Sequence, residues 1–183
     1  MKLIIVQGES ATGKTTLVKR LATDLNLPYF MKDDYKERRY DELGKIPSLR
    51  QWSKIDNDSW EAIYAAIQQA VDSDGSLIIE GNFWRKQRAR IRKIVPESAS
   101  VAEVFCTADP AMIWQRFHER HRQGNRHPGH RDHLWGPTMW LDLTCSKLGW
   151  HWIKPVGISQ RLLRVDTTDF SKLDYQAIKD FVA

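Results

Sequence analysis

The sequence GESATGKT at residues 8–15 constrains the fold of this chain more than any other segment. It follows the apolar, β-branched run KLIIVQ at residues 2–7, which is typical of a strand buried on both faces. After it, apolar side chains recur at helical spacing. These are Leu17, Val18, Leu21, Ala22 and Leu25. A strand, a glycine-bounded loop and a helix in this order predict the start of an α/β domain with a parallel sheet.

The spacing G-x-x-x-x-G-K-T also predicts a chemical role for this loop. Glycines let the backbone N–H groups turn toward phosphate oxygens, and the helix that follows begins with a partial positive charge. Lys14 can reach the β- and γ-phosphates of a nucleotide, and the Thr15 hydroxyl can coordinate Mg²⁺. We therefore expect a phosphate-binding loop (P-loop). Its nucleotide contacts are Gly8, Glu9, Ser10, Ala11, Thr12, Gly13, Lys14, Thr15 and Thr16.

Strands and helices alternate along the rest of the chain. Further strands are expected at residues 28–31, 77–80, 101–106 and 161–165. Capping signals predict helix starts at Asp58, through the pattern D-x-x-E, and at Asp109, whereas residues 35–55 look polar and irregular. A last helix is expected at 172–182. The alternation predicts a single α/β domain over residues 1–183, with three layers and a parallel five-stranded sheet.

Composition and charge narrow the class of protein. The hydrophobic fraction of 42% and the charged fraction of 28% are those of a soluble globular domain, and no apolar run could span a bilayer. With only two cysteines, Cys106 and Cys145, we expect a cytoplasmic protein without membrane contact. The net charge is +5, and residues 85–131 alone carry eleven Lys/Arg against four acids, which suits an anionic ligand.

Acidic side chains come directly after two of the expected strands. Asp33 and Asp34 follow the strand at 28–31, and Glu80 ends the strand at 77–80. Carboxyl ends of parallel strands meet at one edge of a sheet, so these groups should lie near the P-loop. Phosphoryl transfer needs a carboxylate that orients the acceptor hydroxyl and takes its proton, and an acid that holds Mg²⁺. We expect Asp33 to be this base, although a helix cap or turn is an alternative.

The remaining groups at this edge are assigned to the acceptor and the metal. Asp34 is the second candidate for the base and, with Glu80 and Asn82, a candidate for acceptor binding. Glu80 is also expected to hold Mg²⁺, directly or through water, together with Thr15.

These motifs resemble those of the P-loop small-molecule kinases, a family that includes shikimate kinase, chloramphenicol phosphotransferase, zeta-type toxins, AAA-type predicted kinases and the kinase domain of polynucleotide kinase. The matching segments GESATGKTT, KDDY, IIEGNF, RFHERHRQGNRHPGH and RVDTTD span almost the whole chain. The resemblance implies sheet order 2-3-1-4-5, ATP with Mg²⁺, and a lid after the fourth strand at about residues 122–133. It also implies that Asp33 is the base and that Arg126 is the lid arginine. Glu80 departs from many relatives, which have Asp or a glycine-rich turn there.

The stretch RQGNRHPGHRDH at residues 122–133 allows several interpretations. In a lid, Arg126 or, as second candidate, Arg122 would neutralise charge on the γ-phosphate, with Gly124 and Gly129 as hinges. A solvated loop is another interpretation. A zinc site is a third. Its ligands would be His127, His130, Asp132 and His133.

Arg116 and Arg120 share one face of the preceding helix and could reach the adenine or the α-phosphate.

Taken together, these motifs lead us to expect an ATP-dependent kinase that transfers the γ-phosphate to a hydroxyl of a small-molecule acceptor. A polynucleotide 5′-hydroxyl kinase and a nucleotide-dependent ATPase or switch are the alternatives. Nucleic acid would suit the basic segment 85–93, which is more simply a solvated helix face, and tryptophans at 135–152 suit either core packing or stacking on an acceptor. The sequence leaves the acceptor and the oligomeric state open.

Overall fold

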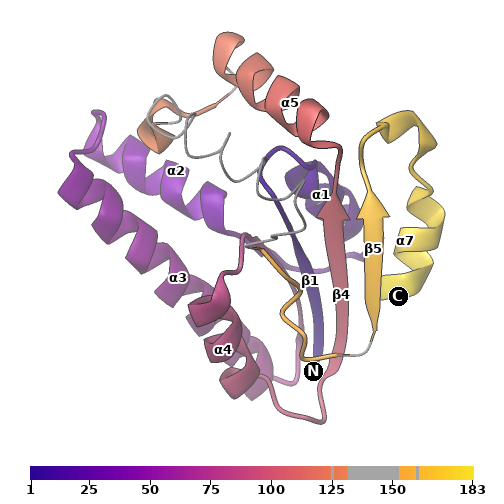
Figure 1. Ribbon diagram of the computed structural model, residues 1–183. Helices are drawn as coiled ribbons and strands as arrows, with labels where there is room; N and C mark the ends of the chain where they lie inside the picture. Colours follow the sequence, from indigo (N-terminus) through magenta and orange to yellow (C-terminus); the bar gives the residue numbers. More distant parts are fainter. Residues whose placement is uncertain (125, 132–152, 160) are drawn as a thin grey trace.

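A five-stranded parallel sheet forms the centre of the computed structural model, which describes residues 1–124, 126–131, 153–159 and 161–183 (Figure 1). The strand order is β2-β3-β1-β4-β5, and every pairing is parallel. The strands are β1 Lys2–Gly8, β2 Tyr29–Met31, β3 Ser76–Gly81, β4 Ser100–Thr107 and β5 Leu162–Asp166. The prediction of a three-layer α/β fold with sheet order 2-3-1-4-5 is confirmed.

Helices connect the strands and cover both faces of the sheet (Figure 1). The helices are α1 Lys14–Leu25, α2 Lys32–Leu43, α3 Leu49–Asp72, α4 Arg85–Ile94, α5 Pro110–Arg122 and α7 Tyr175–Val182. Two short 3-10 helices, η1 Pro128–His130 and η3 Phe170–Lys172, follow α5 and precede α7. As predicted, Asp109 caps α5 by accepting a hydrogen bond from the Ala111 N–H. Within the described part of the chain, no helix is both long and apolar enough for a bilayer.

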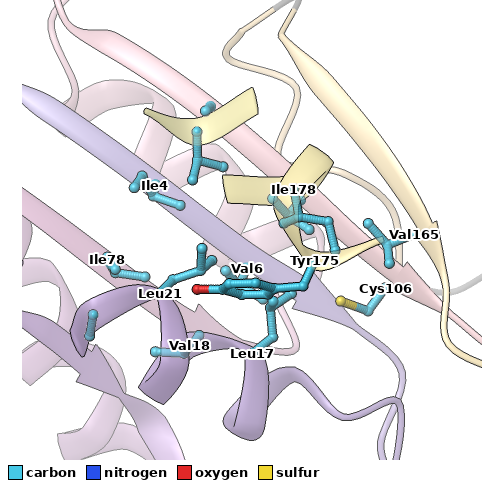
Figure 2. Close-up of a cluster of buried hydrophobic side chains, with 14 of the residues drawn as sticks. Ile4, Val6, Leu17, Val18, Leu21, Ile78, Cys106, Val165, Tyr175 and Ile178 are labelled. Atoms are coloured by element: carbon cyan, nitrogen blue, oxygen red, sulfur yellow. The ribbon is translucent and has the colours of Figure 1, made fainter. Parts of the chain in front are cut away.

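The apolar run of β1 supplies both cores because successive side chains of a strand point to opposite faces. Ile4 and Val6 belong to a cluster with side chains of α1 and α7, shown in Figure 2. Leu3 and Ile5 belong to a second cluster with side chains of α3 and α4. All four are fully buried, which explains why the run is continuously apolar rather than alternating.

The prediction that residues 35–55 are irregular is wrong, because α2 and the first turns of α3 occupy most of them. α2 has the sequence KDDYKERRYDEL and buries only Lys36 and Tyr40, so it lacks the apolar stripe by which helices are recognised. The capping box predicted at Asp58 is also wrong. Ser48 caps α3 instead: its hydroxyl accepts from the Gln51 N–H, and the Gln51 side chain binds the Ser48 N–H.

Gly8 ends β1 at a place where a side chain has no room. Its φ is 147°, and a Cβ atom there would lie 2.1 Å from the backbone oxygen of Cys106 in β4. We predict that Gly8→Ala lowers the free energy of unfolding by about 3 kcal/mol or more, because backbone strain and overlap with a strand add. Gly44→Ala, at φ 62° with open space, should cost only about 1–2 kcal/mol. Equal losses in chemical denaturation would contradict this account.

Candidate active site

The P-loop connects β1 to α1 and bends through backbone angles that favour glycine. Gly8 and Gly13 have φ values of 147° and 77°, and Ala11 has 60°. The Thr12 hydroxyl and the Lys14 ammonium both donate to the Glu9 carbonyl, at 2.8 and 2.6 Å. These bonds close the loop on itself and hold the Lys14 side chain against it. Gly13 is the N-cap residue of α1, so the loop ends at the partially positive end of that helix.

Strand register brings Glu80 beside this loop. Val6 of β1 pairs with Glu80 of β3, two residues before the loop begins. Lys14 Nζ lies 3.9 Å from Glu80 Oε1, and both side chains are less than a tenth exposed. Burial raises the pKa of Glu80 to about 7, and Lys14 opposes this shift only in part. A carboxyl with a pKa near 7 is partly protonated at neutral pH, and a cation bound beside it would favour its ionised form.

The ends of β3 and β2 add the acceptor-side candidates. The Asn82 amide lies 3.4 Å from the Ser10 hydroxyl, so the segment after β3 contacts the P-loop. Met31, the last residue of β2, pairs with Glu80, and α2 begins at the next residue. Asp33, in the first turn of α2, therefore lies at the same edge of the sheet as Glu80, on the side of β3 opposite β1.

A cavity of about 400 Å³ lies between these segments. Twelve of the predicted site residues line it: Ser10, Ala11, Gly13, Lys14, Thr15, Thr16, Asp33, Glu80, Asn82, Arg116, Arg120 and Arg126. The cavity is also lined by five residues that the sequence patterns did not indicate as site residues: Lys32, Gly81, Gln115, Glu119 and Phe170.

Of the predicted residues, Gly8, Glu9 and Thr12 belong to the P-loop but do not line this cavity, and Asp34 and Arg122 lie away from it. Asp34 lines a separate hollow beside β2, with Tyr29 and Arg38 among its neighbours, and burial raises the pKa of Asp34. Arg122, the second lid candidate, forms an ion pair with Glu119 and keeps an exposed side chain. Geometry thus separates Asp33 from Asp34 and Arg126 from Arg122.

The α5 end of the cavity combines a guanidinium with an aromatic ring. Arg116 donates to the carbonyls of Thr167 and Thr168, at 2.7 and 2.8 Å, and its guanidinium lies 4.1 Å from the centre of the Phe170 ring. A Cβ on Gly13 would come within 2.6 Å of the same ring. Phe170, half exposed, is therefore a flat apolar surface at the mouth of the P-loop. Its position after RVDTTD was the only sequence signal for it.

The described part of the predicted lid packs against α2. Asp33, Glu37 and Asp41 recur every four residues and so share one face of that helix, called here the α2 acidic row. Arg126 Nη1 donates to Asp33 Oδ2 at 2.8 Å. His130 Nε2 lies 2.8 Å from Glu37 Oε1. A third contact joins His127 to Asp41 at 3.1 Å. Every carboxylate of the row therefore has a partner in residues 126–131.

Packing reinforces these ion pairs. The Tyr40 ring stacks on His127 and meets His130 edge to face, with ring centres 5.4 and 5.5 Å apart. Gly129 is buried against Tyr40, and a Cβ there would lie 2.4 Å from the ring. We expected Gly129 to be a hinge, but its lack of a side chain serves this contact. Gly124, at φ 69° in open space, keeps the backbone geometry of a hinge.

The zinc interpretation has no counterpart among residues 1–124, 126–131, 153–159 and 161–183, in which no group of three or more His, Cys, Asp and Glu side chains could hold a metal ion. His127 and His130 contact carboxylates of α2 instead. Asp132, His133 and the tryptophans of 135–152 lie outside the described residues.

The partner of Asp33 determines its charge. Burial disfavours the ionised form, but the Arg126 guanidinium, His130 and Lys36 together outweigh this effect and hold the pKa of Asp33 well below its usual value. Asp33 is therefore a carboxylate at neutral pH, as a proton acceptor must be. Arg126 also occupies one of its oxygens, which links the two residues before any ligand binds.

Comparison with solved protein structures identifies the class to which this fold belongs. A provisionally assigned kinase from Chloroflexus aurantiacus is 32% identical, with a TM-score of 0.84 over 99% of this chain and 96% of its own. A gluconokinase from Sinorhizobium meliloti is 18% identical (TM-score 0.53; 99% and 89% covered), and a shikimate kinase from Bacteroides thetaiotaomicron is 16% identical (TM-score 0.52; 98% and 93% covered). No curated protein matches the sequence. The fold is that of P-loop kinases.

The sequence itself identifies the family to which this chain belongs. The sequence model of the family described as AAA domain matches residues 3–134, which contain the P-loop, Asp33, Glu80 and Arg126. The chain belongs to this family.

Glu80 gives this site a testable pH dependence. Its ordinary pKa is 4.5, so the folded protein binds the proton more tightly than the unfolded chain does. Stability should therefore fall as pH rises from about 4.5 to about 7, by up to about 3 kcal/mol. Glu80→Gln cannot ionise and should escape this loss. The variant should gain stability relative to the parent between pH 4.5 and 8 in urea unfolding.

Glu61→Gln provides a control of opposite sign. Glu61 is exposed, and its hydrogen bond from Arg90 lowers its pKa. That variant should lose a little stability relative to the parent as pH rises through the acidic range. Parallel curves for Glu80→Gln and the parent would contradict the proposed burial of an ionisable carboxyl.

Proposed function

We propose that the protein is an ATP-dependent phosphotransferase that moves the γ-phosphate of ATP to a hydroxyl group of a small-molecule acceptor. The observation that carries this proposal is the meeting of the P-loop, Asp33 and Arg126 around one cavity. A phosphate-binding loop alone would suit any nucleotide-binding protein. A carboxylate facing the same cavity, ionised and held by an arginine, is what transfer to a hydroxyl additionally requires.

The nucleotide would lie along the P-loop. Its backbone N–H groups and Lys14 would bind the phosphates, and the base would lie toward α5, near Arg116, Arg120 and Phe170. Thr15 and Glu80 both line the cavity and offer the oxygen ligands that Mg²⁺ prefers, so the residues present fit this ion. When bound, Mg²⁺ would offset negative charge on the phosphates.

Transfer itself would depend on Asp33. The acceptor oxygen attacks the γ-phosphorus, the bond from that phosphorus to the β–γ bridging oxygen breaks, and ADP leaves with the bonding electrons. The hydroxyl proton passes to the Asp33 carboxylate. Arg126 would turn from Asp33 toward the γ-phosphate, so that one movement frees the base and neutralises the transferred group. Residues 122–133 would be the lid that makes this movement, within a single domain.

The two alternatives find less support. A polynucleotide acceptor would use the basic face of α4, yet Arg88 and Arg92 donate to the backbone carbonyls of Lys154 and Val156, and Arg90 binds Glu61. Half of the six basic side chains of α4 therefore have intramolecular partners. A guanine-specific switch would need a base-reading box, but Lys172 in SKLD is exposed and pairs with Asp169. We also propose a cytoplasmic location.

Separate substitutions of the two neighbouring aspartates, Asp33 and Asp34, test the proposal. Asp33→Asn should lower transfer of labelled γ-phosphate from ATP to acceptor alcohols by about 10²–10⁴-fold, because the proton acceptor is lost. ATP affinity should change little, since Asp33 is not part of the P-loop. Asp34→Asn removes the same charge one residue away, outside the cavity, and should retain most of the activity.

The acceptor panel for this assay contains small alcohols, nucleosides and 5′-hydroxyl oligonucleotides. Calorimetric ATP titration of both variants separates binding from transfer. A crippled Asp34→Asn beside a normal Asp33→Asn would refute the assignment of the base, and the absence of transfer to every acceptor would refute the kinase proposal.

A further inference from the structure

A second group of charges lies at the α2 end of the cavity. The ammonium groups of Lys32 and Lys36 both donate to the same oxygen of Asp56, Oδ1, at 2.7 and 2.9 Å. The side chains are 15%, 5% and 23% exposed for Lys32, Lys36 and Asp56 respectively. Two largely buried cations thus share one carboxylate, and this lysine pair with Asp56 carries a net charge of +1.

In the described part of the chain, no second carboxylate forms an ion pair with either lysine. Asp33, whose charge also acts on Lys32, is itself bound by Arg126 at 2.8 Å. Burial lowers the pKa of Lys32, the charge on Lys36 adds to this effect, and Asp56 and Asp33 oppose it.

Two indole rings fix the positions of these cations. Lys32 Nζ lies 4.1 Å from the centre of a Trp60 ring, and Lys36 Nζ lies 4.7 Å from that of Trp52. Cation–π contacts offset part of the lost hydration but add no negative charge. The Lys32 ammonium therefore has a defined position beside the Trp60 ring.

Lys32 lies on the Asp33 side of the cavity, where the acceptor is proposed to bind. It lines the same cavity as Asp33, its neighbour in sequence. It follows β2, at the edge of the sheet, whereas Arg116 and Phe170 follow β4 and β5 on the other side of β1. An acceptor whose hydroxyl reaches Asp33 can therefore bring another of its groups to Lys32 within the same cavity.

We propose that the acceptor is an alcohol that also carries an anionic group, a carboxylate or a phosphate, and that Lys32 binds this group while the Trp60 ring holds the Lys32 ammonium in place. This assignment rests on the proposed kinase function and adds the class of its substrate. An anion next to Lys32 would bring the charge of the lysine pair with Asp56 to about zero, which a neutral sugar or nucleoside cannot do.

Matched acceptors test the proposal. D-gluconate is compared with D-glucose, D-glycerate with glycerol, and thymidine 3′-phosphate with thymidine, each with ATP and Mg²⁺. The anionic member should be phosphorylated with a kcat/KM about 10–100-fold higher, the range expected of a hydrogen bond between a cation and an anion. The carboxylate and phosphate pairs distinguish the two kinds of anion. Equal or better use of the neutral members would overturn the proposal.

Binding of the same anions is measured separately by calorimetry, with the P-loop filled by a non-hydrolysable ATP analogue and Mg²⁺. Lys32→Gln should weaken binding by about 10–100-fold, whereas Lys45→Gln, the same change in the exposed segment between α2 and α3, should not. Asp56→Asn leaves both lysines without their carboxylate and should tighten binding. A merely structural role predicts that both Lys32→Gln and Asp56→Asn weaken it.

Thermal unfolding of each variant shows whether it folds. If Asp56→Asn does not fold, anion binding by the parent, Lys32→Gln and Lys45→Gln still tests the proposal. Binding that is undetectable in the parent, or unchanged in Lys32→Gln, overturns the proposal whether or not transfer is observed. Anion binding that depends on Lys32, without any transfer from ATP, would contradict the kinase function and leave the anion site standing.

Discussion

Parallel register is the constraint on which the site depends. Because β1 lies between β3 and β4, and β3 between β1 and β2, the carboxyl ends of three neighbouring strands supply the P-loop, Glu80 with Asn82, and α2 with Asp33. Glu80 pairs with Val6 on one side and Met31 on the other. A slip of one residue in β3 would turn this carboxyl to the other face of the sheet. The apolar cores on both faces prevent such a slip.

The second organising feature is the contact of residues 126–131 with the α2 acidic row. Arg126 binds the carboxylate that is our candidate for the base, while His130 and His127 bind the next two acids of α2. The candidate lid and base therefore form one unit before a ligand enters. The same helix begins with Lys32, so α2 brings together the groups proposed for proton transfer and for recognition of the acceptor.

Sequence patterns predicted the parts of this molecule that depend on local spacing. The P-loop, the five strands and the cap at Asp109 follow from glycine positions, apolar runs and capping chemistry, and the structure confirms their placement. α2 escaped prediction because ion pairs and Tyr40 hold it, not an apolar stripe. Lys32 and Phe170 escaped because their roles arise from partners distant in sequence, such as Asp56 and Gly13.

The most direct test of the central claim is a crystal structure of the protein with Mg²⁺ and a non-hydrolysable ATP analogue. The account predicts the triphosphate along the P-loop, with Lys14 and Thr15 at its phosphates and metal. Arg126, now 2.8 Å from Asp33, should have moved to the γ-phosphate, leaving both Asp33 oxygens facing the acceptor side. A nucleotide bound elsewhere, or a bound triphosphate with Arg126 still on Asp33 and far from the γ-phosphate, would contradict it.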